Sequence, residues 1–151
     1  MNMLAKELTF IQENLTNIDK QNLSVSKVSV GWHLDHSLKV INAVLGVLHK
    51  SDPKEYKRSF NFLRTMVFLK GAFPRGKAKS PKRVLPPEII LKEDIEKQLK
   101  LAEDNLKIIP KISDKQHFSH PLFKQLNKKQ TLQFLKLHTQ HHFKIIEDIV
   151  K

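Results

Sequence analysis

The sequence predicts an all-α protein, a four-helix bundle with a long crossover between its second and third long helices. Apolar residues recur every three or four positions in four long stretches, which is the period of an amphipathic helix. Only four glycines and seven prolines interrupt the 151 residues, so a few long elements are favoured over many short strands. About 40 residues separate the second stretch from the third, enough to cross a bundle roughly 30 Å long. The length suits a single domain over residues 1–151.

The first two long helices are predicted from regular apolar stripes. The stripe of the first helix runs from Leu4 to Ile18 at spacings of three and four. After a polar loop, Ser29 is a suitable N-cap for the second helix, and the sequence Ser51–Pro53 ends it. The stripe of the second helix is regular enough to predict deep burial, and it consists of Leu34, Leu38, Ile41, Leu45 and Leu48.

A shorter helix and an irregular loop are predicted between the second and third long helices. Apolar residues from Tyr56 to Phe68 predict the short helix, which ends at Gly71. The stretch "GAFPRGKAKSPKRVLPPE" follows it, and its glycines and prolines predict a loop without regular structure. This loop and the short helix together form the predicted crossover.

The third and fourth long helices complete the predicted bundle. The third begins at about Pro87 and Pro110 ends it, with a stripe that includes Ile95 and Leu99. A connection follows, and the pattern predicts no strand in it. The last helix is capped by Asn127 or Thr131 and runs to the end of the sequence.

The composition excludes several classes of site. The chain has no cysteine, so it has no disulfide, no zinc–thiolate site and no cysteine nucleophile. No apolar run approaches the roughly 20 residues that a membrane-spanning helix needs, and the first residues do not resemble a signal peptide. We therefore expect a cytoplasmic protein that does not act on a membrane.

Positive charge is concentrated in one part of the sequence. Lysine and arginine number 27 against 15 acidic residues, and many of them crowd residues 50–83. A solvated surface is the ordinary interpretation of such a run, and an anionic ligand or partner is the alternative. If the crossover folds over a site, four of its cations are candidates to bind an anionic cofactor or substrate: Arg75, Lys79, Lys82 and Arg83.

The last helix carries histidines inside its apolar stripe. His138 and His142 are four residues apart and therefore lie on one face of the helix, with His141 one step round. Buried imidazoles need partners, and one divalent metal can satisfy both rings. The protease motif HExxH is excluded because Thr139 replaces its glutamate. A pair of histidines at this spacing is also often structural.

The second helix offers the third ligand that such a metal needs. Its candidates are His33 and His36, and helical geometry does not choose between them, although His33 lies nearer the centre of the apolar arc. Asp35 is a further candidate, either as a ligand or as a partner that orients an imidazole. Asp35 and His141 are also the weak candidates for a catalytic base.

Three stretches of the sequence carry a resemblance to a known family. They are "SVGWHLDHSLKVI", "FPRGKAKSPKRVLPP" and "HPLFKQLNKKQTLQFLKLHTQHH". Together they resemble the DinB/YfiT-like superfamily of metal-binding four-helix bundles, and within it a branch known as a domain of unknown function. In that family a serine precedes a metal-ligand histidine by seven residues. Counting from Ser29, the resemblance implies His36 as the third ligand beside His138 and His142.

The resemblance also implies a topology and an activity. It implies an up-down-down-up bundle and a metal, commonly zinc or nickel, held by three histidines. Characterised relatives are S-transferases or isomerases that use a low-molecular-weight thiol such as bacillithiol, mycothiol or glutathione, and others are described as metal-dependent hydrolases. Relatives often follow the last ligand with an arginine and a glutamine, whereas this chain has Phe143, Lys144 and Ile145.

Two functions follow from these observations. The first is a metal-dependent enzyme, a hydrolase or a thiol-dependent S-transferase, whose small-molecule substrate is unknown. The alternative is a non-catalytic binding protein with a structural or vestigial metal site and a basic surface for an anionic partner. A homodimer is a further expectation, while nucleic acid is disfavoured because no known nucleic-acid-binding motif is present.

Overall fold

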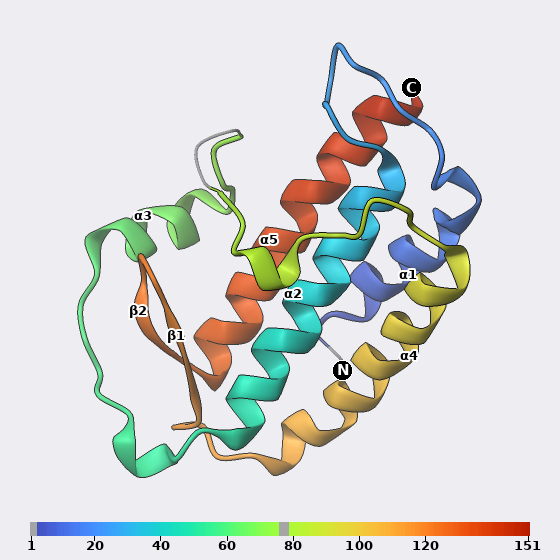
Figure 1. The fold of residues 1–151 in the computed structure, drawn as a ribbon. Helices are drawn as coiled ribbons and strands as arrows, with labels where there is room; N and C mark the ends of the chain where they lie inside the picture. The colour runs from blue at the N-terminus through green and yellow to red at the C-terminus, as the bar shows by residue number, and fades with distance from the viewer. Residues whose placement is uncertain (1–2, 76–78) are drawn as a thin grey trace.

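The computed structural model describes residues 3–75 and 79–151, and helices dominate it (Figure 1). Four helices lie along one another, and a fifth helix and a two-stranded hairpin lie beside them. Among the described residues, none of the helices is both long and apolar enough to cross a membrane. The helices are α1 (Ala5–Glu13), α2 (Val30–Lys50), α3 (Phe62–Lys70), α4 (Lys92–Ile108) and α5 (Lys128–Val150).

Polar caps begin the two helices that carry the histidines. Ser29 Oγ accepts a hydrogen bond from the backbone N–H of Trp32 at 3.3 Å, so the predicted start of α2 is confirmed. Asn127 begins α5 with a capping box, in which Asn127 and Gln130 each bond the other's backbone N–H. Thr131 lies inside α5 instead, and its hydroxyl donates to the carbonyl of Leu126. The caps therefore set the register of both histidine-bearing helices.

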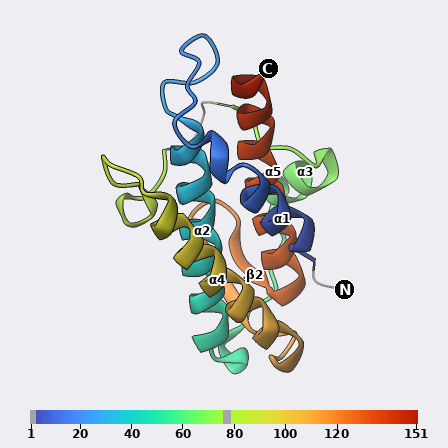
Figure 2. The ribbon, with the colours of Figure 1, turned by 90° about the vertical axis from the view of Figure 1, so that its right-hand side faces the viewer.

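Helix α2 is the centre of the core and packs against both α4 and α5. Its predicted stripe is confirmed, because all five of its side chains are fully buried. Figure 2 shows α4 in front of α2 and α1 in front of α5, which closes the core on that side. The buried face of α4 consists of Ile95, Leu99, Ala102 and Leu106.

Three predicted helices are shorter than the sequence pattern indicates, and one of them, the short helix predicted from Tyr56, begins only at Phe62. Helix α1 ends at Glu13 and a 3-10 turn over Leu15–Asn17 follows it, so Leu15 is buried from a turn. Helix α4 begins at Lys92, and the residues between Pro87 and Lys92 run as an irregular chain.

The prediction that the chain contains no strand is wrong. Strands β1 (His117–His120) and β2 (Lys124–Asn127) form an antiparallel hairpin in the predicted connection. Four residues are too few to show the alternation of a strand, and Phe118 and Leu126 pair on the buried side only in the folded chain. The fold is therefore mostly helical rather than purely all-α.

The segment between α2 and α4, which we call the crossover, contains α3. Asn61 caps this helix by accepting the N–H of Arg64 at 2.8 Å, and Gly71 ends it with a φ of 66°, a conformation that favours glycine. The chain after α3 then passes across α5 and α2 on its way to α4 (Figure 1). Residues 82–84 form a 3-10 turn on this path, and the carbonyl of Val84 in this turn contacts His36 of α2.

Candidate metal centre

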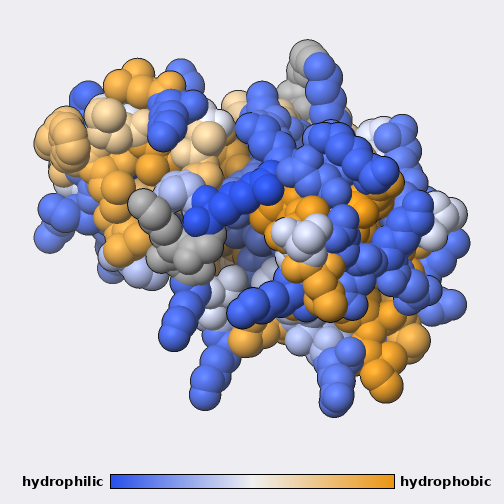
Figure 3. Space-filling view, turned by 90° about the horizontal axis from the view of Figure 1, so that it is seen from above, coloured by the Kyte–Doolittle hydropathy of each residue, from blue (hydrophilic) through white to orange (hydrophobic). Residues whose placement is uncertain are grey.

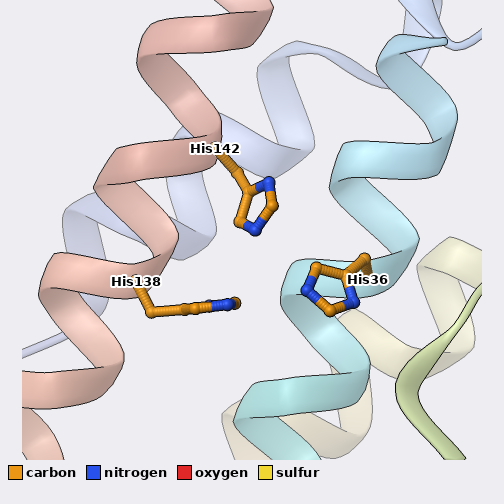
Figure 4. A group of neighbouring side chains, drawn as sticks. All are labelled: His36, His138 and His142. Carbon is orange, nitrogen blue, oxygen red and sulfur yellow. The ribbon is translucent and has the colours of Figure 1, made fainter. Parts of the chain in front are cut away.

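Three histidines from two helices converge inside the bundle. His36 on α2 faces His138 and His142 on α5 (Figure 4). One ligand nitrogen from each ring lies within 4.8 Å of the others, and His36 and His142 are almost completely buried. Zinc–nitrogen bonds are about 2.0–2.1 Å long, so two ligand nitrogens on one metal are at most about 4.2 Å apart. The cluster could therefore hold a metal ion after a small inward movement of its rings.

A backbone contact sets the orientation of the His36 ring. His36 Nδ1 lies 2.8 Å from the carbonyl oxygen of Val84 in the crossover. Because a carbonyl only accepts, Nδ1 carries the proton and Nε2 keeps a free lone pair. Ser80 Oγ lies 3.4 Å from that Nε2, and Trp32 stacks on the ring with 4.9 Å between centroids. The crossover thus prepares His36 to bind a metal through Nε2.

His142 is oriented by the other histidine of α2. His142 Nδ1 lies 2.9 Å from His33 Nδ1, and His33 Nε2 lies 3.1 Å from Ser26 Oγ. If His142 binds a metal through Nε2, its Nδ1–H donates to His33, and the N–H of His33 then donates to Ser26. This one arrangement of protons satisfies both hydrogen bonds, from His142 to His33 and from His33 to Ser26. His33 therefore contacts a candidate ligand and stands outside the three-histidine group.

His138 has an unsatisfied nitrogen in the interior. Among the residues that the structure describes, none offers a hydrogen-bond partner to its buried Nδ1. An unpaired buried polar atom of this kind costs about 1–3 kcal/mol, so native proteins usually satisfy it with a partner. A bound ion or an ordered water supplies what this nitrogen lacks. The orphaned atom therefore fits a ligand in the cluster.

The burial of the cluster keeps its imidazoles neutral. Burial lowers the pKa of His138 to about 3 and that of His33 to about 4, and neighbouring histidines add to both effects. Burial likewise lowers the pKa of His36 and of His142. Only a neutral imidazole binds a metal, so protons compete weakly for these ligands at neutral pH.

The two weak candidates for a catalytic base lie in different surroundings. Asp35 is buried against α4, where it accepts a hydrogen bond from Gln98 at 2.7 Å and pairs with Lys39 at 2.8 Å. It braces two helices and is not in the three-histidine group. His141 is half-buried, with its ring 5.2 Å from that of His142.

A small cavity opens beside His141. It encloses about 70 Å³ between α5 and the segment after α3, and Arg75 and Lys144 line it together with Gln140. Arg75 also pairs with Asp148 at 2.9 Å, which anchors this part of the crossover on α5. Burial and the charges of Arg75 and Lys144 lower the pKa of His141. The cavity is therefore a basic niche next to the cluster.

The remaining basic candidates are not brought to this niche. Lys79, Lys82 and Arg83 are exposed on the crossover, and Lys82 and Arg83 belong to the turn whose Val84 carbonyl contacts His36. Lys77, in the same basic run, lies outside the described residues.

Sequence reasoning missed the residues that orient the rings. Val84 acts through its backbone carbonyl, and no pattern in a sequence signals such a contact. Ser26 lies in a polar loop, and Trp32 has the ordinary signature of a core residue. Ser26 and His33 are seven residues apart, a spacing that would place them on one face of a helix. Because Ser26 lies in the loop before α2, helical periodicity does not predict their contact.

Comparison with known proteins gives no match, since no family model, no curated protein and no solved structure is similar to this chain. What the chain can do must therefore be argued from the site itself.

Proposed function

We propose that this protein is a metal-dependent enzyme of the DinB/YfiT-like type, with His36, His138 and His142 as ligands of zinc or nickel. The convergence of three neutral imidazoles from two helices is the observation that supports it. The up-down-down-up topology of that family and its single domain belong to the same proposal. The sequence motifs support the family resemblance, and the three-histidine cluster supports the metal-dependent activity.

Three nitrogen ligands suit a catalytic rather than a structural site. A structural zinc is usually closed by four protein ligands, whereas three leave a coordination position open. When bound, the metal supplies a Lewis acid at that position, suited to water in hydrolysis or to an external thiolate in transfer. Because the chain has no cysteine, the nucleophile must come from water or from a low-molecular-weight thiol.

The surroundings of the cluster indicate the charge of the substrate. Arg75 and Lys144 line the niche beside His141, and their positive charges favour an anionic group there even though Arg75 also pairs with Asp148. The niche is small enough to receive a carboxylate rather than a whole cofactor. His141 is better placed than Asp35 to exchange a proton there, because both oxygens of Asp35 face Lys39 and Gln98.

Metal content tests the proposal directly. The protein, purified without a histidine tag, is expected to hold about one zinc or nickel ion per chain by elemental analysis. His36→Ala, His138→Ala and His142→Ala should each remove most of that metal. His49→Ala is the matched control, because His49 lies on α2 far along the helix from His36. A metal-free wild type, or an unchanged metal content in His142→Ala, would refute the proposal.

A binding protein is the second candidate, favoured by one feature of the crossover. Residues 56–87 contain nine lysines and arginines and no acidic residue. Binding to an anionic partner such as nucleic acid would then weaken steeply with salt, and more gently after Lys79→Gln, Lys82→Gln and Arg83→Gln together. The absence of binding to DNA or RNA at low salt would remove nucleic acid as the partner.

A further inference from the structure

One side of the molecule presents large apolar side chains to solvent. We call this surface the α3 face, and it consists of Phe60, Phe62, Leu63, Met66, Leu69 and Leu122. Each of these side chains is between 48% and 79% exposed. Figure 3 shows apolar colour gathered at the edge of the molecule where α3 lies. Single exposed apolar residues are common, whereas a cluster of this kind marks a contact surface.

The α3 face is continuous because hydrogen bonds join its two parts. Asn61 Nδ2 donates to the carbonyl of Leu122 at 2.9 Å, which holds the turn of the hairpin beside the start of α3. Beneath the helix, buried Arg64 donates to the carbonyls of Phe123 and Ser59. Arg64 thus points inward and anchors the helix together with buried Val67, while Phe62, Leu63, Met66 and Leu69 are exposed to solvent.

The size of this surface matches an interface between proteins. A phenylalanine can bury about 150–250 Å², so the six side chains together expose on the order of 600 Å². A stable interface buries about 800 Å² on each partner, of which about 65% is apolar in homodimers. The apolar part of such an interface is therefore about 500 Å² on each side, which the α3 face supplies alone.

The charges around the α3 face indicate which kind of partner can bind there. The face itself contains no charged side chain, and four exposed cations surround it along the chain: Lys57, Arg58, Lys70 and Lys124. In a two-fold interface the same patch meets itself, so it must be self-complementary. A purely apolar centre satisfies this condition, and the cations can remain at the solvated rim.

We propose that the α3 face binds a second copy of this chain in a two-fold symmetric dimer. Burial of the apolar stripe drives association, and the rim cations of the two copies oppose it. Salt screens that repulsion, so the dimer must tighten as the salt concentration rises. An acidic partner or an anionic lipid surface would show the opposite dependence, because salt weakens attraction between opposite charges.

Sedimentation velocity across a range of protein and salt concentrations tests the proposal. The wild type is expected to form a dimer whose dissociation constant falls as salt is raised. Leu69→Lys should weaken the dimer by at least a hundredfold, because it places a charge in the apolar centre. Leu23→Lys is the matched control, since Leu23 is 76% exposed, close to the 79% of Leu69, but lies in the loop before α2. Circular dichroism checks that both variants keep the fold.

Three results would overturn the proposal. The first is a wild type that stays monomeric at the highest concentration and salt. The second is a dimer that Leu69→Lys and Leu23→Lys weaken equally, which would place the contact elsewhere. The third is a monomer that binds vesicles containing anionic phospholipid and loses this binding in Leu69→Lys, which would assign the face to a lipid surface.

Discussion

The histidine cluster and the α3 face break the usual rule of burial in opposite directions. In the cluster, polar rings of α2 and α5 lie in the interior, where His33 contacts His142, the Val84 carbonyl contacts His36, and Nδ1 of His138 has no partner among the described residues. On the α3 face, rings and aliphatic chains that could fill a core lie in solvent. Each departure costs free energy in the isolated chain, and each is offset when a partner binds. The two regions therefore call for partners of different size in the functions proposed above: an ion for the cluster and a protein surface for the α3 face.

Removal of metal should give the largest effect and tests the cluster side of this comparison. A ligand that binds only the folded state at a thousand times its dissociation constant stabilises it by about 4 kcal/mol. We therefore expect chelation to lower the melting temperature of the wild type by several degrees and to leave His142→Ala unchanged. Calorimetry with and without a chelator measures this. Equal melting temperatures of loaded and chelated wild type would contradict it.

The stability of the metal-free protein should fall in acid. An unfolded histidine has a pKa near 6.5, whereas burial lowers the pKa of His138 to about 3 in the folded protein. Between these values the unfolded state binds more protons, so stability rises with pH and is lost as pH falls below 6.5. Each such histidine contributes at most about 1.4 kcal/mol per pH unit in this window.

Urea unfolding of the chelated protein at pH 7 and pH 5 measures that loss. His138→Gln removes one titrating group and should reduce the difference between the two pH values by up to about 2 kcal/mol. His49→Gln should change it less, because His49 is less buried than the cluster. An unchanged pH dependence in His138→Gln would show that its ring is solvated in the native state.

Loss of His33 should weaken metal binding without removing a ligand. His33→Phe keeps an aromatic ring at this position but deletes the acceptor 2.9 Å from His142 Nδ1. Groups that orient a ligand in this way are typically worth at least about tenfold in metal affinity, or about 1.4 kcal/mol. Competition with a chelating dye measures the affinity. His117→Phe is the control, since His117 is buried outside the cluster, and the idea fails if both variants bind metal equally well.

The smallest expected effect concerns the stability of the monomer. Because Leu69 is 79% exposed, Leu69→Ser should change the free energy of unfolding by less than about 0.5 kcal/mol in dilute protein. Leu45→Ala, at a fully buried position, should cost about 2–5 kcal/mol under the same conditions. Urea unfolding of the dilute protein compares them. A large loss in Leu69→Ser would mean that α3 is packed differently and that its face is not free to bind.

The helices were largely predictable, and the regions between them were not. The stripe of α2 and the caps at Ser29 and Asn127 act within one or two turns of helix, so the sequence pattern reveals them. The hairpin was missed because each strand has four residues and is defined by its partner. The exposure of the α3 face was missed because an amphipathic pattern does not show which apolar side chains become buried in the folded protein.

That His138 and His142 share a face of α5 could be predicted from the sequence, because the helical period places residues four apart on the same side. It could not choose between His33 and His36 by geometry, since both lie on the buried side of α2. The resemblance implied His36, and the tertiary structure shows that His36 meets the pair, that His33 contacts His142, and that the Val84 carbonyl contacts His36. Helical periodicity determines on which side of one helix a side chain lies. The packing of α2, α5 and the crossover determines which side chains from different elements come into contact.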